Sequence, residues 1–385
     1  MDMKNIETPC YIIDEKRFND NCLKFEKEFT RAWGSNLIFA YPVKTNHHQY
    51  FLGLAKKRKW YAEVVSDREY FLAIKSGFNK NNIIFNGPTK GNAFNSAIST
   101  NAIINLDNFE EIYQLIRNKQ NINCRVGIRV NFDLEKKCKG ETSAGNHPSR
   151  FGICYENGDL IKAIKLLANN HIKIIGVHMH TSTKTRSKKV FKEISNVVCM
   201  LKREFDLEFN YIDLGGGFFG GKVHNSYPSI SEYADVICDT LSREFTSDKT
   251  TLILEPGASV IATAVDYFVK VRSVKHIQDE IIVTVDGSKL HINPFMSDRI
   301  PNYEIIGQLG EKECIQQICG STCMESDRMI LLRDQGKLNT NNYIIFHDAG
   351  AYTLSLNNSF INYPPRVYIK TEREIGKWLE CKESL

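Results

Sequence analysis

The sequence lacks any run that approaches the roughly 20 consecutive apolar residues of a membrane-spanning helix. Its first residues, MDMKNIETPC, also lack the apolar stretch of a secretory signal, so we expect a cytoplasmic protein. No large block of like charge is present, and 50 Lys and Arg against 45 Asp and Glu leave a net charge of +5. A nucleic-acid partner is not expected, because phosphate binding needs a concentrated basic face.

Metal-binding signatures are missing as well. None of the 11 cysteines forms a C-x-x-C pair, and no spacing of cysteine and histidine resembles a zinc site. We therefore expect no metal, and cysteines that are mostly reduced and packed in the core. No internal repeat, low-complexity tract or long linker interrupts the 385 residues.

What is present is ordinary globular composition, with 42% hydrophobic and 25% charged residues. In the first two thirds, short apolar segments alternate with segments of i, i+3, i+4 spacing, which predicts strands followed by helices. Eight such units favour a closed (β/α)8 barrel over an open sheet. The expected strands are 37–41, 61–65, 83–85, 102–105, 124–130, 172–179, 211–214 and 251–254, and Asp67 and Asp107 are the expected helix N-caps.

Beyond Pro256 the pattern changes to strands with few helices between them. We predict a β-sandwich or β-barrel domain with strands at 265–274, 280–285, 303–306, 343–346 and 367–369. Residues 9–13 also resemble a strand, which could begin the barrel or return to the β-rich domain. The predicted domains are the barrel at 25–260, and a β-rich domain of 1–24 with 261–385.

Reactive groups of such a barrel sit where its strands end. Lys44 follows an apolar strand, where partial loss of water would make its amine a nucleophile or Schiff base, unless it is an ordinary surface lysine. His178 and His180 lie on one face of a strand. They could bind a metal, for which no third ligand is evident, or stack on an aromatic ligand.

The segment from Asp213 to Gly221 gives the sharpest local signal. Three glycines, Gly215, Gly216 and Gly217, directly follow a strand, and their N–H groups could cradle a phosphate. The alternative is a flexible turn. The segment matches neither G-x-G-x-x-G with a distant acidic residue nor a Walker loop, so a nicotinamide dinucleotide or ATP is not predicted.

Glu255 ends the last barrel strand, and is a candidate acid or base, metal ligand, or partner of a protonated ring nitrogen. A lysine, a phosphate cradle, a stacking histidine and a carboxylate at one end of a barrel are the groups that pyridoxal 5′-phosphate requires.

The chain resembles the fold-type III decarboxylases that use this cofactor and act on diaminopimelate, ornithine and arginine, and the diaminopimelate branch is the nearer match. The resemblance runs from Thr8 to about Pro364. Its motifs are Thr8-Pro9, Tyr41 to Asn46, Val64 to Ser66 with Glu69, Phe85 to Pro88, Ser149 to Ile153, His178 to His180, Asp213 to Phe218, Glu255 to Gly257, Val285 to Gly287, Cys319 to Cys323 and Asp348 to Tyr352.

The resemblance implies roles at matching positions. Lys44 would form the Schiff base, His180 would stack on the ring, and Glu255 would pair with the ring nitrogen. Cys323, inserted from the partner of a homodimer, would return a proton to the substrate. The other implied cofactor-binding residues are Glu63, Arg129, Thr183, Gly215, Gly216, Gly217, Gly257 and Tyr352.

Some positions depart from the family pattern. Ala258, Asn293 and Met324 stand where charged or basic residues commonly bind the phosphate or the far end of the substrate. Glu325 and Arg299 are the candidate replacements, with Arg328 as a further one. The substrate is therefore diaminopimelate, another diamino acid or an amino-acid conjugate.

Three alternatives remain. An amino-acid racemase shares this architecture but sets an arginine against the ring nitrogen, where this chain has Glu255. A cofactor-homeostasis barrel lacks the β-rich domain. A catalytically inactive homologue would act as a binding partner, which the presence of Lys44, the glycine run and Cys323 disfavours.

Overall fold

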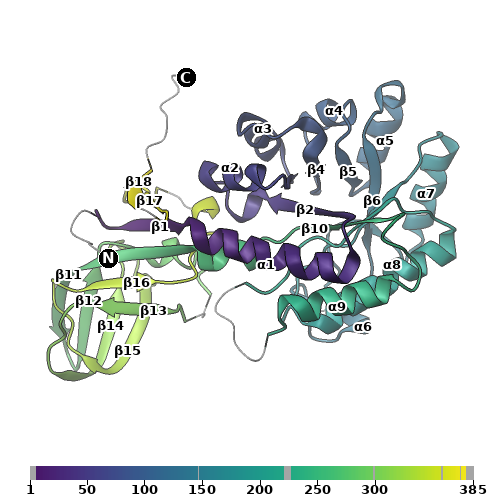
Figure 1. Ribbon diagram of the computed structural model, residues 1–385. Helices are drawn as coiled ribbons and strands as arrows, with labels where there is room; N and C mark the ends of the chain where they lie inside the picture. Colours follow the sequence, from purple (N-terminus) through teal and green to yellow (C-terminus); the bar gives the residue numbers. More distant parts are fainter. Residues whose placement is uncertain are drawn as a thin grey trace. The chain divides into compact units, whose positions relative to one another are not determined.

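The computed structural model describes residues 6–145, 147–220, 227–297, 300–356, 359–372 and 374–378 (Figure 1). The chain divides into two compact units, of which one is Leu23–Ser259 and the other is Met1–Cys22 with Val260–Leu385. We call them the barrel unit and the β unit. The predicted domain bounds differ from these by one or two residues.

The barrel unit contains eight parallel strands in the order β5-β4-β3-β2-β10-β9-β8-β6. Strands β5 and β6 are also hydrogen-bonded to each other, so the sheet closes into a ring. This confirms the predicted barrel. The strands in chain order are β2 (Leu37–Pro42), β3 (Tyr61–Val64), β4 (Ile83–Phe85), β5 (Ile103–Leu106), β6 (Arg125–Asn131), β8 (Gly176–His178), β9 (Tyr211–Asp213) and β10 (Thr251–Leu254), with the short β7 (Ile153–Cys154) beside β6.

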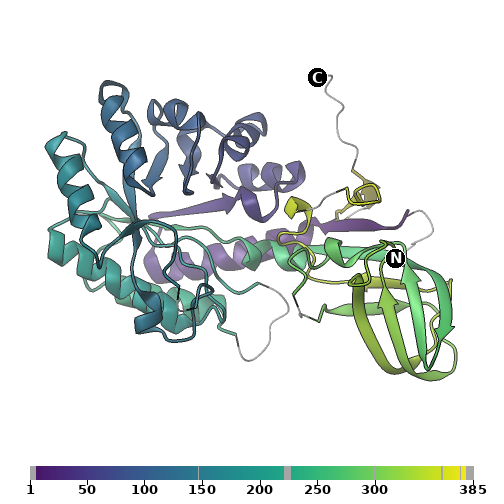
Figure 2. The ribbon, with the colours of Figure 1, turned by 180° about the vertical axis from the view of Figure 1, so that it is seen from behind.

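Helices of the barrel unit lie outside these strands, as both ribbon views show (Figures 1 and 2). Each covers the barrel with an apolar face, such as the Ile112 and Leu115 face of the fifth helix. The helices of the chain are α1 (Glu15–Trp33), α2 (Gln49–Lys57), α3 (Asp67–Lys75), α4 (Ala93–Ile98), α5 (Phe109–Arg117), α6 (Leu134–Lys137), α7 (Asp159–Asn169), α8 (Lys188–Phe205), α9 (Ile230–Leu241) and α10 (Ala258–Ile261). Among the described residues, no helix is long and apolar enough to span a membrane.

The β unit is one mixed sheet. Its strands are β1 (Cys10–Asp14), β11 (Val265–Ile277), β12 (Glu280–Val285), β13 (Tyr303–Ile306), β14 (Lys312–Cys319), β15 (Arg328–Gly336), β16 (Tyr343–Phe346), β17 (Arg366–Lys370) and β18 (Ile375–Lys377). The N-terminal strand β1 lies between β11 and β17, which decides the open question: it belongs to the β unit. Cys10, Ile12, Phe268, Ile345 and Tyr368 form a buried cluster there.

Several local predictions were wrong. Strand β8 keeps only three of the eight residues predicted at 172–179, since the preceding segment is not paired as a strand. The helix N-caps are Ser66 and Asn108, whose side chains accept hydrogen bonds from Glu69 N and Glu111 N, and not the adjacent aspartates. Strands β14 and β15 were not predicted, because Gln316 and Gln317 are adjacent in β14 and Arg333 begins a polar stretch in β15. Both features break the alternation that identifies a strand.

One aromatic side chain fixes the interior of the barrel. Tyr211 on β9 pairs in register with Gly176 on β8, which in turn pairs with Gly127 on β6. A Cβ on Gly176 would lie 2.1 Å from the Tyr211 ring, and one on Gly127 would lie 2.0 Å from its hydroxyl oxygen. The phenol therefore occupies space that only two glycines on neighbouring strands leave open.

We expect Gly176→Ala to lower the free energy of unfolding by about 1–3 kcal/mol, because the added methyl group must displace the buried ring. Urea denaturation followed by circular dichroism measures this. Gly53→Ala in α2 is the matched control, since nothing lies within 4 Å of the added carbon. It should raise stability by about 0.5–1 kcal/mol. Equal stabilities for wild type and Gly176→Ala would contradict the close packing.

Candidate active site

Lys44 lies in the short 3-10 helix η2 (Val43–Thr45), which directly follows β2 at the carboxyl end of the barrel strands. Its ammonium forms an ion pair with the carboxylate of Glu63, which projects from the next strand, β3. The Glu63 side chain is 1% exposed, whereas that of Lys44 is 32% exposed. The lysine is thus held by a buried counter-ion while its amine remains partly accessible.

Two buried asparagines extend this polar group across the barrel. Asn86 follows β4, and its amide nitrogen donates to Glu255 Oε1 at 2.7 Å and to Glu63 Oε1 at 3.2 Å. Asn105 on β5 donates to Asn86 Oδ1 at 2.8 Å and to Asp213 Oδ2 at 3.3 Å. Side chains on or directly after five strands, β3, β4, β5, β9 and β10, therefore meet in one hydrogen-bonded cluster.

The three glycines after β9 form a tight turn against His180 and Glu255. Gly215 and Gly217 have φ values of +66° and +95°, which side-chain-bearing residues rarely adopt. A Cβ on Gly215 would lie 2.5 Å from His180 Cβ, and one on Gly216 would lie 2.7 Å from the Glu255 carbonyl oxygen. Because glycine is required for this geometry, the flexible-turn alternative is disfavoured, and no side chain of the turn lies between its backbone and a close-lying anion.

His180 takes one side of this turn. The amide of Gly216 donates to its Nδ1 at 3.1 Å, so that nitrogen carries no proton. Loss of water contact, followed by the positive charges of Arg129 and Lys44, lowers the pKa of His180. The imidazole is neutral at physiological pH and offers a flat, uncharged face.

Arg129 on β6 joins the site from another side. It forms an ion pair with Asp107 at 3.2 Å and donates to the carbonyl oxygen of His180 at 3.1 Å. Its guanidinium also lies over the ring of Phe151, 4.6 Å from the centroid. Arg129 thus fixes the backbone at His180.

Asp213 and Glu255 form a buried pair of carboxyl groups. Burial raises the pKa of both, and the negative charge of Glu63 raises both further. Asp213 raises the pKa of Glu255, whereas the hydrogen bond with Glu255 lowers that of Asp213. His178 lies beside them with both ring nitrogens buried and without a hydrogen-bond partner. Its pKa is lowered well below the usual value by burial and by the positive charge of Arg129.

His178, Asp213 and Glu255 also form a group that could hold a metal ion, since their ligand atoms lie within 4.8 Å of one another. The sequence suggested no third ligand for the histidines, and the structure brings two carboxylates to His178. The same carboxylates, however, accept hydrogen bonds from Asn86 and Asn105, which makes the group part of the larger cluster.

Two further predicted residues lie at the edge of this cluster. A Cβ on Gly257 would lie 2.6 Å from the Thr45 hydroxyl oxygen, so this glycine allows the end of β10 to approach the lysine turn. Thr183 lies in the loop after β8, where its backbone pairs with Thr142 in an isolated bridge. Its contact with a cofactor stays a prediction.

The remaining predicted residues belong to the β unit. Cys323 is an exposed free thiol. The turn that carries it is held by buried Asp327, which accepts hydrogen bonds from the backbone and hydroxyl of Thr322. Tyr352 has a φ of +65°. Glu325 is 3.6 Å from Arg328, both exposed, and Met324 precedes it. Arg299 lies outside the described residues, and the roles of the others stay predictions.

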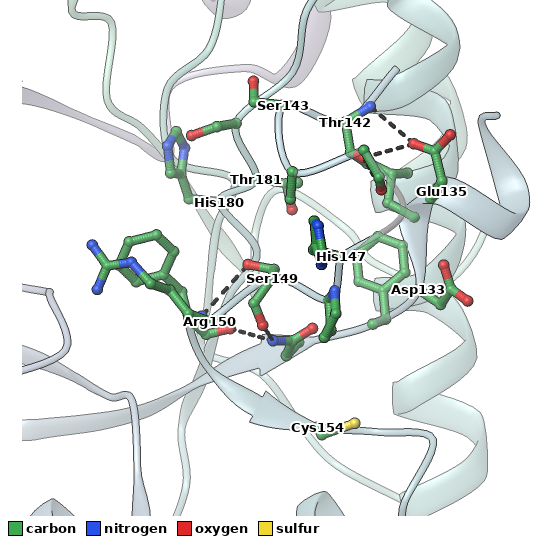
Figure 3. A pocket seen from close by; sticks show the side chains of 18 of the residues that line it. Asp133, Glu135, Thr142, Ser143, His147, Ser149, Arg150, Cys154, His180 and Thr181 are labelled. Atoms are coloured by element: carbon green, nitrogen blue, oxygen red, sulfur yellow. Dashed lines mark hydrogen bonds between the residues drawn. The ribbon is translucent and has the colours of Figure 1, made fainter. Parts of the chain in front are cut away.

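A cavity of about 630 Å³ opens beside His180 (Figure 3). One wall is formed by residues 131–135, 142–145 and 147–151, which include Thr142, His147 and Arg150, and the other by residues 180–182. Backbone hydrogen bonds join the two walls, such as that from Ser143 N to Ser182 O at 3.1 Å. The cavity gives a ligand at His180 room to extend within the barrel unit.

Sequence reasoning missed the asparagines. Asn86 is included above only within the motif from Phe85 to Pro88, and Asn105 and Tyr211 are placed in predicted strands without a further role. Position was the available signal, because Asn86 directly follows β4 as Lys44 follows β2. Asp213 was quoted within the glycine motif but given no role.

Comparisons with known proteins agree with this geometry. A diaminopimelate decarboxylase of Methanocaldococcus jannaschii is 28% identical over 374 residues, covering 92% of this chain and 84% of that protein. A diaminopimelate decarboxylase of Staphylococcus aureus is 25% identical, and the match covers 92% of this chain and 86% of that protein. A crystal structure of the M. jannaschii enzyme matches with a TM-score of 0.87 and 25% identity, over 97% of this chain and 90% of that one.

A viral arginine decarboxylase, from Paramecium bursaria Chlorella virus, shares the fold with a TM-score of 0.79 at 18% identity. The pyridoxal binding domain model of the pyridoxal-dependent decarboxylases matches residues 15–262. The chain belongs to this family. It is a pyridoxal-phosphate-dependent amino-acid decarboxylase, which sets aside the racemase and the inactive homologue.

The residues present fit pyridoxal phosphate. The described part of the barrel unit supplies an amine, an anion cradle of three glycines, a neutral flat imidazole and a buried carboxylate, which are the groups the cofactor needs. The hydroxyl of Ser259 is also buried without a hydrogen-bond partner. A Cβ on Gly220 would lie 2.5 Å from Ser259 N, so this serine adjoins the glycine segment.

The lowered pKa of His178 gives a pH prediction for the cofactor-free protein. Unfolded histidine binds a proton below about pH 6.5, whereas buried His178 does not, so its contribution to stability is present above pH 6.5 and lost as pH falls. We expect wild type to lose up to about 1.4 kcal/mol per pH unit more than His178→Asn in this range. Urea denaturation at several pH values measures the difference. Exposed His276→Asn is the control, and parallel curves for all three would contradict the prediction.

Proposed function

We propose that Lys44 is the residue that binds the aldehyde carbon of pyridoxal phosphate, and that Glu255 faces the ring nitrogen. The observation that carries this proposal is the Lys44–Glu63 ion pair linked to Glu255 by Asn86, at the carboxyl end of the barrel. Residues at strand ends of such a barrel are positioned for chemistry.

The other residues of the site have separate proposed roles in binding the cofactor. The glycine turn at Gly215, Gly216 and Gly217 receives the phosphate, with the Ser259 hydroxyl adjoining. His180 stacks on the ring, and Arg129 and Glu63 hold His180 and Lys44 in place. Gly257 permits the close approach of β10 to the lysine turn. Thr183 and Tyr352 complete the cofactor site.

Bound pyridoxal phosphate supplies the electron sink that accepts the pair released when a carboxylate leaves as CO₂. Glu255 supports this chemistry, since a carboxylate favours a protonated ring nitrogen. Lys44 releases the product amine, and the thiol of Cys323 returns a proton to the substrate carbon. Exposure of that thiol agrees with a role at an interface.

We also propose a cytoplasmic homodimer with shared sites. Large apolar side chains of the β unit are strongly exposed in the single chain, with Phe295 at 69%, Ile300 at 81% and Tyr363 at 93%. These exposures support the proposal that another protein covers part of the β unit, since proteins bury large apolar side chains at their interfaces. A two-fold dimer would bury the same surface on both copies.

For the substrate we propose diaminopimelate or a closely related diamino acid. The curated relatives named above are diaminopimelate decarboxylases, and a structure of the M. jannaschii enzyme is in co-complex with L-lysine. Asn293 bonds to Ser297 through both ends of its amide, so it is occupied within its own loop. Met324, Glu325 and Arg299 are the residues proposed to adapt the far end of the site.

The lysine assignment is tested with the protein reconstituted with pyridoxal phosphate. We expect an absorbance band near ~420 nm that Lys44→Ala abolishes, because the band needs the lysine amine. Lys57→Ala, at the exposed end of α2, is the matched control and should keep the band. A band of wild-type strength in Lys44→Ala would refute the assignment.

The substrate is tested by CO₂ release from meso-diaminopimelate, lysine, ornithine and arginine. We expect diaminopimelate to give the highest kcat/KM, and Glu255→Gln to lower kcat by about 100-fold or more, because the ring nitrogen loses its charged partner. Release from another diamino acid alone would reassign the substrate. Racemisation without CO₂ from every compound would overturn decarboxylation.

A further inference from the structure

A continuous chain of hydrogen bonds joins the core of the barrel to Lys44. The Tyr211 hydroxyl donates to Asn105 Oδ1 at 2.9 Å, and Asn105 Nδ2 donates to Asn86 Oδ1 at 2.8 Å. Asn86 Nδ2 donates to both Glu63 and Glu255, and Glu63 accepts from the Lys44 ammonium. Lys44, through Glu63, and Glu255, the proposed partner of the ring nitrogen, are thus both linked to the amide of Asn86.

The orientation of both amides is determined by their partners. Each NH₂ group makes two donor contacts, those of Asn86 to Glu63 and Glu255, and those of Asn105 to Asn86 and Asp213. Turning either amide over would set its oxygen against a carboxylate oxygen. Asn86 and Asn105 are 2% and 1% exposed, so water does not compete for these bonds.

We propose that Asn86 is a positioning residue that couples the two ends of the cofactor site. Its two N–H groups hold the carboxyl groups of Glu63 and Glu255 side by side, and Tyr211 fixes the position of Asn86 through Asn105. This inference uses the proposed roles of Lys44 and Glu255, whereas the hydrogen-bond chain itself does not depend on them.

The physical reason is the repulsion between the two carboxylates. A shared neutral donor favours negative charge on both carboxyl groups and opposes the burial that raises the pKa of Glu255. It therefore increases the negative charge that stabilises positive charge on the Lys44 nitrogen. Without the Asn86 amide, Glu63 or Glu255 would take up a proton more readily. The positive charge on the Lys44 nitrogen would then be less stabilised. The charged and titratable groups that face Glu63 and Glu255 are Lys44, Glu69, Asp107, Arg129, His178, His180 and Asp213.

The main test compares Asn86→Leu with wild type in the reconstituted protein. Leucine has nearly the shape of asparagine but donates no hydrogen bond. We expect the visible band of the bound cofactor to disappear at a pH about one unit lower or more, because positive charge on the lysine nitrogen loses anionic support. An increase of roughly tenfold in the cofactor dissociation constant should accompany the shift.

A second readout needs no cofactor. In the cofactor-free protein, acylation of Lys44 by acetic anhydride is followed by mass spectrometry as a function of pH. Asn86→Leu should move the midpoint of Lys44 labelling to lower pH, while labelling of exposed Lys57 stays unchanged. This measurement tests the coupling even if Lys44 does not bind the cofactor.

Two further variants separate coupling from loss of stability. Asn342→Leu removes a fully buried asparagine with three hydrogen bonds in the β unit. It should cost stability and leave both midpoints in place. Tyr211→Phe keeps the ring that fills the barrel and removes only the donor to Asn105. It should shift both midpoints in the same direction as Asn86→Leu, by a smaller amount.

The outcomes are distinct. Unchanged midpoints in folded Asn86→Leu overturn the inference, and so does an equal shift in Asn342→Leu. If Asn86→Leu does not fold, an unchanged labelling midpoint in Tyr211→Phe overturns it. A wild-type band that survives Lys44→Ala refutes the proposed function instead, and the labelling result then decides the coupling alone.

Discussion

Charge compensation inside the barrel is the constraint on which the site depends. Glu63, Asp213 and Glu255 are carboxyl groups with at most 2% of their surface exposed. An isolated buried charge would cost several kcal/mol, so each needs a cation or a donor. Lys44 and the two asparagines provide these partners, and Gly215 N adds a hydrogen bond to Asp213 at 2.9 Å. The groups that hold one another in the fold are therefore those proposed to meet the cofactor.

The barrel strands make this compensation possible by geometry. Strand ends on a closed ring point to a common centre, so residues far apart in sequence become neighbours. Below the charged cluster, Tyr211 fills the interior against Gly127 and Gly176, and its hydroxyl is the contact between apolar core and polar site. The Tyr211 ring packs in the barrel interior while its hydroxyl bonds the polar cluster, so the position of the cluster is tied to the packing of the core.

Part of this could be predicted from sequence. Lys44, Glu255 and the glycine run each follow a clear apolar strand, so the rule that barrel chemistry lies at strand ends identified them. Asn86 could not be recognised in this way. An Asn-Gly-Pro sequence is typical of a turn, and its partners Glu63 and Glu255 lie 23 and 169 positions away. Strands β14 and β15 were missed because Gln316, Gln317 and Arg333 interrupt their apolar pattern.

The position of β1 has a consequence for biosynthesis. Cys10 on this strand pairs with Phe268 on one side and with Arg366 on the other, so its neighbours lie near the far end of the chain. At about 5–20 residues per second, a ribosome takes roughly 20 to 70 seconds to make β17 after it has made β1. The β unit cannot close until β17 has been made. By that time every strand of the barrel unit has been synthesised. The apolar edge of β1 is thus the segment that a nascent chain must keep from pairing with other strands for longest.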